Sequence, residues 1–528
     1  MLNTFSILSL IIAIPFMGML FALTAREDEN ASTRNIYNVS LFAVIANIVM
    51  IWRIFMLIDV YKPGFQLIET FNWMDAPDIN ITFGVDVFSL LMILAIHIAF
   101  VIGFLGVRNN LVRQKSLMVL SLLFLSMVTG FFVAADIFSF YIFFEGMLLP
   151  LFMLMGMFGE IRRQGLIHRF LLYNMLGAVL FFVATVFLFN YQGGAVKLDS
   201  LRQIELNSTV EYFIWGAIFV SLLSRIPVWP FHYWISSINS HIKNPLIFII
   251  SSIIPLTGIY GFVRFLPKHL PDDLAVYVMI LQIVCVVTML FIALIGFINK
   301  DRQYKMFAYI TIYYIMYLLG VLTRVDVVLL NIAFSFFSYL IIVSALEVIA
   351  SYLYKQQESL GVSDDGILCA VPGISFVYSF LVLAGIGMPL SSLFLNNFLI
   401  LSNLLAENIK MGMIVVCSLV LVSATLLQEL FRLKDRSRLC PAAAAALDLD
   451  KAGLAFMAFV CFVLINRCGL CSAPEEIKVW LSTCWLSHRN LHCCCPLRLC
   501  FWSIVFVSPK RPRHFTPCQS SFLSFRAC

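Results

Sequence analysis

Long apolar runs follow one another along most of this 528-residue chain, and they constrain its fold more than any other feature. A run of about 20 apolar residues is long enough to cross the hydrocarbon core of a bilayer. Lipid offers the backbone no hydrogen-bond partners, so such runs cross as helices. The chain is 61% hydrophobic and only 12% charged, which excludes an ordinary soluble protein. We therefore predict an all-α polytopic membrane protein.

About fourteen helical spans are expected from these runs, with interruptions in the seventh and the twelfth. Pro227 lies at the end of the seventh span and Pro230 directly after it, and Gly385, Gly387 and Pro389 lie inside the twelfth. Broken membrane helices are tolerated where they line a cavity or are buried in protein. The expected spans are Leu2–Leu23, Ile36–Ile58, Phe83–Gly106, Lys115–Ala134, Ile137–Phe158, His168–Phe189, Glu211–Val228, Pro245–Leu266, Leu274–Ile298, Tyr304–Leu322, Val325–Tyr354, Leu368–Leu405, Ile409–Phe431 and Ala452–Ile465.

The charges of the chain lie mainly in the loops between spans. Lys and Arg are more frequent in alternate loops on one side, which predicts that this side faces inward and that the N-terminus lies outside. The net charge of +6 belongs to membrane loops, so it predicts a lipid bilayer and no nucleic acid as partner. No nucleotide-binding fingerprint is present, which argues against an ATP-driven pump.

Three regions differ in composition. Residues 1–431 form the predicted membrane domain with the first thirteen helices, and 432–467 form a connecting segment with a short last span. Residues 468–528 form an atypical Cys-rich tail, with a Cys468/Cys471 CxxC pair. The tail lacks the paired spacing typical of a zinc or iron–sulfur site, so we favour a tail without metal. A peripheral extension and a sequence read past a frameshift both stay open.

Glu145 is the first candidate functional residue. It lies within the apolar stretch 135–159, which has Asp136 at its start as a supporting polar residue. A carboxylate at that depth in a membrane helix is costly and is a functional candidate by default. The alternative is a buried Glu that only fixes helix packing through a partner cation. Of the two, we favour a functional role.

Arg225 is the expected partner of Glu145, because it ends another apolar span just before the Pro-rich break. An opposite charge within a few ångströms would keep Glu145 ionised. His232 and His241 flank the same break and are further candidates for a proton path. Asn331 and Asn397, with the tyrosines of the tenth span, can hold a water chain. Ordinary helix–helix hydrogen bonds would use the same groups.

Three motifs resemble one family. FGVDVFSLLMILAIH (83–97), DIFSFYIFFEGMLLPLFMLMGMFG (136–159) and IPVWPFHYWISSINSH (226–241) resemble the third-span, Glu-containing and Trp-Pro-Phe-His motifs of the antiporter-like subunits of respiratory complex I. The resemblance covers roughly residues 2–431. It implies a fourteen-span fold with inverted repeats and a proton channel.

The resemblance also assigns residues, with several departures. The fifth-span Glu of the family matches Glu145, and the seventh-span Lys falls on Arg225. The eighth-span Lys falls on Leu256, the eleventh-span His on Asn331 and the twelfth-span Glu on Asn397. Arginine effectively cannot release a proton, whereas a buried lysine can. Three interpretations stay open: pumping through water wires with Glu145 as main switch, pumping through rerouted groups such as His232, His241 or the tyrosines, and a structural subunit.

The implied function is that of a core membrane-arm subunit of complex I, which couples NADH:ubiquinone reduction to proton translocation. The implied partners are the other membrane-arm subunits. NADH, FMN, iron–sulfur clusters and ubiquinone would belong to those other subunits, and this chain would bind no cofactor or metal. The implied location is the mitochondrial inner membrane, with the N-terminus on the intermembrane-space side. The alternatives are a cation/proton antiporter component and a transport-inactive structural subunit.

Overall fold

The computed structural model describes residues 6–434, with gaps at 26–30, 61, 63, 75–78, 109–112, 159–163, 193, 195, 199–207, 233–243, 267–271, 361–365, 371 and 390. The chain divides into two units, 1–472 and 473–528, and every described residue belongs to the first. The expected last span Ala452–Ile465, the Cys-rich tail and His241 lie outside the described residues.

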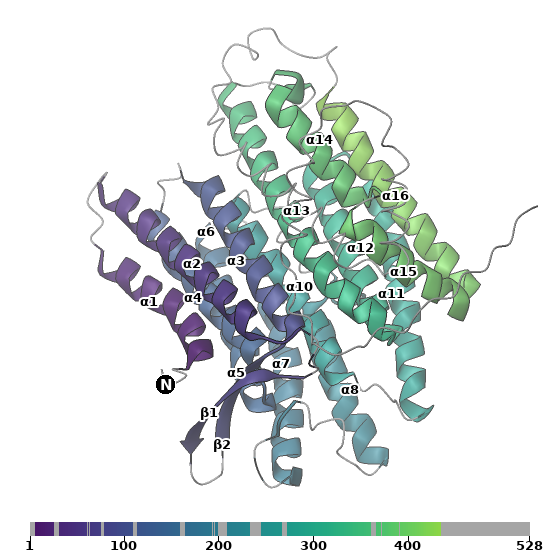
Figure 1. Cartoon of the computed structure of the whole chain (residues 1–528). Helices are drawn as coiled ribbons and strands as arrows, with labels where there is room; N and C mark the ends of the chain where they lie inside the picture. The colour runs from purple at the N-terminus through teal and green to yellow at the C-terminus, as the bar shows by residue number, and fades with distance from the viewer. Residues whose placement is uncertain are drawn as a thin grey trace, which may run out of the picture. The chain divides into compact units, whose positions relative to one another are not determined.

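The first unit is a bundle of helices (Figure 1). Within the described ranges, eleven candidate spans are long and apolar enough to cross a membrane. The chain is thus a polytopic helical membrane protein, as the apolar runs predict. The helices are α1 (Ile7–Thr24), α2 (Ala31–Leu57), α3 (Val87–Val107), α4 (Gln114–Val133), α5 (Ile137–Gly146), α6 (Leu148–Phe158), α7 (Gln164–Gln192), α8 (Ser208–Arg225), α10 (Pro245–Phe265), α11 (Asp272–Ile298), α12 (Arg302–Leu322), α13 (Asp326–Leu360), α14 (Pro372–Ile386), α15 (Ser392–Glu407) and α16 (Ile409–Leu433), with a 3-10 helix at Ile367–Ala370.

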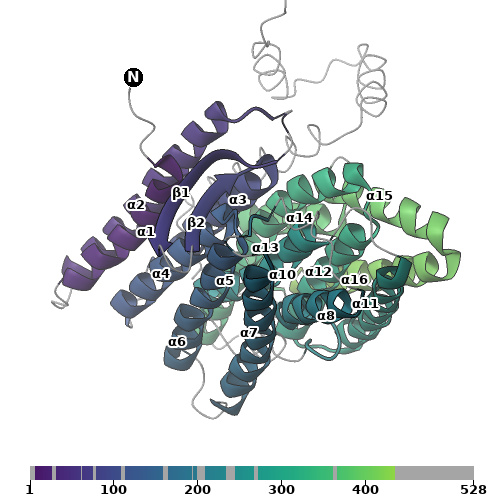
Figure 2. The same ribbon diagram turned by 90° about the horizontal axis from the view of Figure 1, so that it is seen from below.

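The interior of the bundle is formed by α10, α12 and α13, which pack against one another and are the most deeply buried spans. Figure 2 shows α10 and α12 surrounded by neighbouring helices. Most of their side chains are apolar or carry hydroxyl groups. The charged Arg264 of α10 and Lys305 of α12 are held in ion pairs. The helices α1, α2 and α7 expose many large apolar side chains, as expected for surfaces that face lipid.

A two-stranded antiparallel hairpin is the one sheet in the described part of the chain, and the sequence analysis did not predict it. Strand β1 (Gln66–Met74) pairs with β2 (Ile79–Val85), beside α4 and α5 (Figure 1). The expected third span began at Phe83, but Phe83 lies in β2, and α3 begins at Val87. Asp86 caps α3 by accepting a hydrogen bond from Ser89 N at 2.8 Å.

The ion pair between Asp86 and Arg264 joins the start of α3 to the end of α10, with 2.7 Å between Oδ1 and Nη2. Burial raises the pKa of the Asp86 carboxyl, but Arg264 and the Ser89 hydrogen bonds outweigh it, so the pKa lies below its usual value. Glu69 of β1 similarly caps α1, because its carboxylate accepts from the Leu8 and Ser9 amides at 2.9 and 3.1 Å. The hairpin and these caps fix one end of the bundle.

Two of the expected spans are divided into shorter helices. Residues 137–158 form α5 and α6, which meet at Met147. The expected twelfth span has an interruption at residues 387–391, between α14 and α15, where Gly387 has a φ of +87° that suits glycine. The helix α8 ends at Arg225, before Pro227 and Pro230.

Candidate functional site

Asp136 positions the helix that carries Glu145. It is 1% exposed and caps α5, where Oδ1 accepts from Ser139 N at 2.7 Å. Its Oδ2 accepts from Thr82 N of β2 at 2.6 Å, which connects the hairpin to α5. Burial raises the pKa of the Asp136 carboxyl, against the hydrogen bonds from Ser139 that lower it. Asp136, expected to be a supporting polar residue, therefore orients α5.

The interruption between α5 and α6 places Glu145 and the carbonyl of Phe144 in the last turn of α5. Carbonyls in a last helical turn lack partners within their helix. Pro150, which follows in α6, has no N–H to offer the residue four positions before it. The end of α5 therefore presents free acceptor groups to a neighbouring helix.

Arg225, at the end of α8, contacts these acceptor groups. Its Nη2 donates to the Phe144 carbonyl at 2.8 Å and lies 3.4 Å from Glu145 Oε1. The guanidinium carbon lies 3.8 Å from the centroid of the Phe144 ring, within the range of a cation–π contact. The Arg225 side chain is fully buried, whereas that of Glu145 is 24% exposed. The structure thus brings together the two residues expected to pair.

Close helix packing holds Arg225 in this place. The helix α8 lies against α7 and α10. Gly258 of α10 faces the end of α8, and a Cβ at that position would lie 2.8 Å from the Leu222 carbonyl and 3.1 Å from Arg225 Cβ. Only glycine permits this approach without a shift of the helices. Arg225 Nε and Nη1 have no hydrogen-bond partner among the described residues, so its charge is balanced mainly by Glu145.

The two histidines expected near this pair are not joined to it in the described structure. His232 follows α8, and its ring lies edge-on to Phe291 of α11 with centroids 6.3 Å apart. No hydrogen bond between His232 and Glu145 or Arg225 is found among the described residues. His241 lies outside the described residues. Their part in a proton path stays a prediction.

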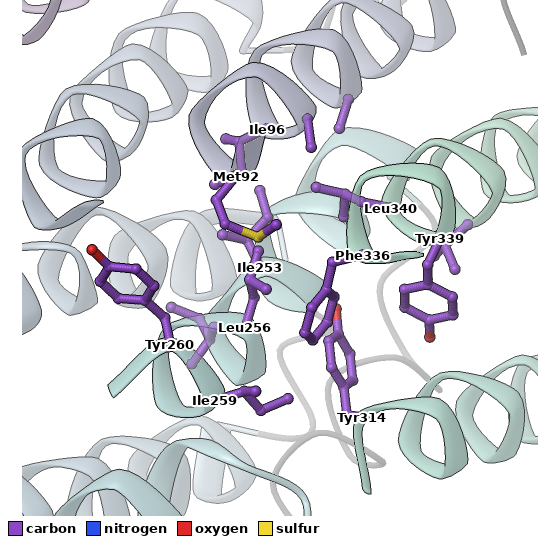
Figure 3. Packing of buried hydrophobic residues seen from close by; sticks show 14 of the residues in the cluster. Met92, Ile96, Ile253, Leu256, Ile259, Tyr260, Tyr314, Phe336, Tyr339 and Leu340 are labelled. Atoms are coloured by element: carbon purple, nitrogen blue, oxygen red, sulfur yellow. The ribbon is translucent and has the colours of Figure 1, made fainter. Parts of the chain in front are cut away.

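An apolar cluster surrounds Leu256, the position at which the resemblance places a lysine. Leu256 of α10 is 2% exposed. Figure 3 shows it among buried aliphatic and aromatic side chains of α3, α10, α12 and α13. Leucine has no titratable group, so Leu256 itself cannot pass a proton. The labelled neighbours are Met92 and Ile96 of α3, Ile253, Ile259 and Tyr260 of α10, Tyr314 of α12, and Phe336, Tyr339 and Leu340 of α13.

Asn397, a further departure from the family pattern, lies beside the interruption between α14 and α15. Its Nδ2 lies 3.4 Å from Tyr313 Oη. Tyr313 in turn donates to the Gly385 carbonyl at 2.7 Å, and Tyr309 donates to the same carbonyl at 3.2 Å. A line of hydroxyl groups thus reaches Asn397 from α12. Asn331, where the resemblance places a histidine, is buried on α13 and 4% exposed.

The comparison with known families decides the identity of the fold. The family described as NADH:quinone oxidoreductase/Mrp antiporter, TM, matches residues 134–423. This range is more than half of the chain and includes Glu145 and Arg225.

The chain belongs to this family.

Relatives of the antiporter family agree with this assignment. NADH-quinone oxidoreductase subunit M of Rickettsia prowazekii is 25% identical over 435 residues, which cover 80% of this chain and 87% of that protein. NADH-ubiquinone oxidoreductase chain 4 of Marchantia polymorpha is 26% identical over 434 residues, 78% of this chain and 84% of that protein. A chain of respiratory complex I from Thermus thermophilus shares the fold with a TM-score of 0.75 at 18% identity, over 88% of this chain and 95% of that one.

One group of charged residues was not singled out by sequence reasoning. Lys305 and Glu429 form a buried ion pair between α12 and α16, with 3.1 Å between Nζ and Oε2. The two residues are 124 positions apart in the sequence, so no local pattern connects them. The sequence signal that could have identified this pair is that each residue is ionisable and lies near the end of an apolar span. A residue of opposite charge is expected beside such a group.

Proposed function

We propose that the chain is a core membrane-arm subunit of respiratory complex I and contributes to proton translocation. The observation that carries this proposal is the Glu145–Arg225 pair, set at a helix interruption inside a bundle of the NADH:quinone oxidoreductase/Mrp antiporter family. The relatives named as subunits of NADH-quinone and NADH-ubiquinone oxidoreductases support the same assignment. The chain acts in NADH:quinone reduction as a subunit, together with other membrane-arm subunits.

In this proposal Glu145 is the group that exchanges protons. A carboxylate gains and releases a proton readily, whereas a guanidinium stays charged. Arg225 therefore supplies a fixed positive charge, which favours the ionised form of Glu145. Glu145 is partly uncovered by this chain, and in this proposal water reaches the carboxylate there. A conformational change that moves Arg225 away from Glu145 would favour uptake of a proton, and its return would favour release.

The redox groups lie elsewhere in this proposal. NADH, FMN, the iron–sulfur clusters and ubiquinone belong to other subunits, and this chain responds to quinone reduction through its neighbours. We further propose the mitochondrial inner membrane as the location, with the N-terminus on the intermembrane-space side, supported by the likeness to the Marchantia chain 4 protein and by the loop charges. Fractionation, and labelling of a cysteine introduced near the N-terminus with an impermeant reagent, test both points.

Replacement of Glu145 by Gln in the assembled complex tests the function. We expect protons translocated per NADH oxidised to fall, while NADH oxidation with an uncoupler continues. Glu407→Gln is the matched control, because Glu407 is exposed at the end of α15, and it should leave the stoichiometry unchanged. Unchanged pumping in Glu145→Gln would favour the transport-inactive structural subunit, an alternative supported by the apolar cluster around Leu256.

A cation/proton antiporter component is the other candidate, because the family includes Mrp antiporters. Purification separates the two possibilities. Co-migration of this chain with a large NADH-oxidising assembly is the expected result. Recovery in a small assembly that exchanges Na⁺ or K⁺ for protons, without NADH oxidation, would point to the antiporter.

A further inference from the structure

A second group of buried charges lies at the junction of α12 and α16, away from the Glu145–Arg225 pair. Lys305 in the first turn of α12 and Glu429 near the end of α16 are each 3% exposed. Their Nζ and Oε2 atoms are 3.1 Å apart. Unlike the Glu145–Arg225 pair, this pair contains a cation that can release a proton.

Two arginines hold Glu429 independently of Lys305. Arg302 Nε lies 3.4 Å from Glu429 Oε1, and Arg432 Nη1 lies 3.6 Å from Oε2. Each guanidinium is also fixed to the backbone, since Arg302 donates to the Ala350 carbonyl at 3.2 Å and Arg432 to the Lys300 carbonyl at 2.9 Å. The carboxylate therefore keeps two permanent counter-charges whatever the state of Lys305.

This arrangement lets Lys305 change its charge without leaving a buried carboxylate uncompensated. Loss of a lysine proton from a simple buried Lys–Glu pair leaves an isolated anion, which is strongly destabilising. Here Glu429 would still lie within ion-pair distance of Arg302 and Arg432. Further ionisable groups near this cluster include Glu347 of α13 and Tyr378 of α14, which interact electrostatically with Arg302, and Lys300, whose carbonyl accepts from Arg432.

Lys305 also begins a line of polar side chains along one face of α12. Tyr309 and Tyr313 follow it at intervals of four residues, which places all three on the same side of the helix. Both tyrosines are buried and donate to the Gly385 carbonyl. Tyr313 also lies 3.4 Å from Asn397 Nδ2. This line runs from the end of the bundle to the interruption between α14 and α15.

We propose that Lys305 is a proton-exchanging residue at the outer end of a path that follows Tyr309 and Tyr313 to Asn397, with Glu429, Arg302 and Arg432 as its positioning residues. This inference rests on the proposed proton translocation. In each cycle the Lys305 ammonium gives one proton toward the path and regains one from the aqueous side. No heavy-atom bond changes and no electron is transferred, so the step needs no redox partner.

Lys305→Arg in the assembled complex is the test. Arginine keeps the charge and can pair with Glu429, but it cannot release a proton. We expect the variant to assemble and to oxidise NADH with an uncoupler, and to translocate fewer protons per NADH. Lys300→Arg is the matched control, because the exposed Lys300 contributes only its backbone carbonyl to the cluster, and it should pump like wild type.

Wild-type stoichiometry in Lys305→Arg would overturn the inference and show that the pair only fixes helix packing. If that variant does not assemble, Tyr313→Phe removes a single hydroxyl from the path. It should also lower the stoichiometry, and unchanged pumping in Tyr313→Phe would equally overturn the inference. Glu145→Gln, measured in parallel, separates the two proposals. Loss in Glu145→Gln without loss in Lys305→Arg refutes this path alone, whereas no loss in either variant refutes the proposed function itself.

Discussion

Removal of the Arg225 charge should destabilise the protein, because it leaves Glu145 without its counter-charge. Arg225→Met keeps much of the apolar volume of the side chain but removes the guanidinium. Two unit charges 3.4 Å apart attract each other by about 5 kcal/mol at an effective dielectric constant of about 20. The 24% exposure of the Glu145 side chain lowers this value, so we expect loss of the attraction to destabilise the protein by about 2–5 kcal/mol. The hydrogen bond to Phe144 is lost as well.

A second substitution separates the charge from the other contacts. In the double variant Arg225→Met/Glu145→Gln no uncompensated charge remains at the site, so it should be more stable than Arg225→Met alone. Breaking a buried pair by removing one partner costs about 3–5 kcal/mol, whereas replacement of both partners is often close to neutral. The two substitutions should therefore couple by at least about 1.4 kcal/mol, equivalent to about tenfold in a rate.

The assay is the rate at which the assembled complex loses NADH oxidation activity on heating. We expect both single variants to inactivate faster than the double variant, and Arg225→Met at least about tenfold faster than it. Glu145→Gln completes the cycle. The effects of the two single substitutions on the barrier to inactivation should not simply add. If their sum matches the effect of the double variant to within about 0.5 kcal/mol, the reasoning is refuted, because the two charges then do not interact in the protein.

Two further substitutions test the packing that positions the pair. Gly177→Ala should lower the midpoint of thermal inactivation, because a Cβ on α7 would lie 2.9 Å from Ser224 Cβ and 3.2 Å from the Ser221 carbonyl of α8. Gly216→Ala on α8, with nothing within 4 Å of the added atom, should not lower it, and equal effects would contradict the account. Asp136→Ala should destabilise by about 2 kcal/mol through loss of the α5 cap and an unsatisfied Thr82 amide. Asp301→Ala removes an exposed cap of α12 and should lower the midpoint of thermal inactivation less than Asp136→Ala does. A larger decrease for Asp301→Ala would contradict this reasoning.

The Glu145–Arg225 pairing was predictable from the sequence for a physical reason. Each residue is a rare charge within or at the end of an apolar span, beside Gly or Pro residues that interrupt the helix. A bilayer strongly disfavours an unpaired charge, so two opposite charges of this kind are expected to meet. The burial of Leu256 among aliphatic and aromatic side chains is likewise what an uncharged residue within an apolar span predicts.

Other features depended on tertiary contacts that the sequence pattern does not encode. The end of the second strand of the hairpin, residues 83–85, is apolar and leads into α3, so it was assigned to the span. The ion pair between Lys305 and Glu429 connects residues 124 positions apart. Charges at the ends of membrane helices usually reach water, and only the packing of α12 against α16 shows that these two do not.

The division between α5 and α6 had a local signal. Gly146 and Pro150 lie close together, and a proline within a helix removes one backbone hydrogen bond and crowds the preceding turn. The span was long and apolar enough that we expected it to continue. The interruption matters because it frees the Phe144 carbonyl for Arg225. Sequence reasoning thus identified the residues of the pair but not the backbone geometry that joins them.

Infrared difference spectroscopy of the intact complex tests the central claim, that Glu145 gains and loses a proton during turnover. Spectra recorded at rest and during NADH oxidation should differ by a carboxylic-acid C=O band. We predict that this band is lost in Glu145→Gln and retained in Glu407→Gln. A band that persists unchanged in Glu145→Gln would contradict the account, because the protonated carboxyl would then belong to another residue.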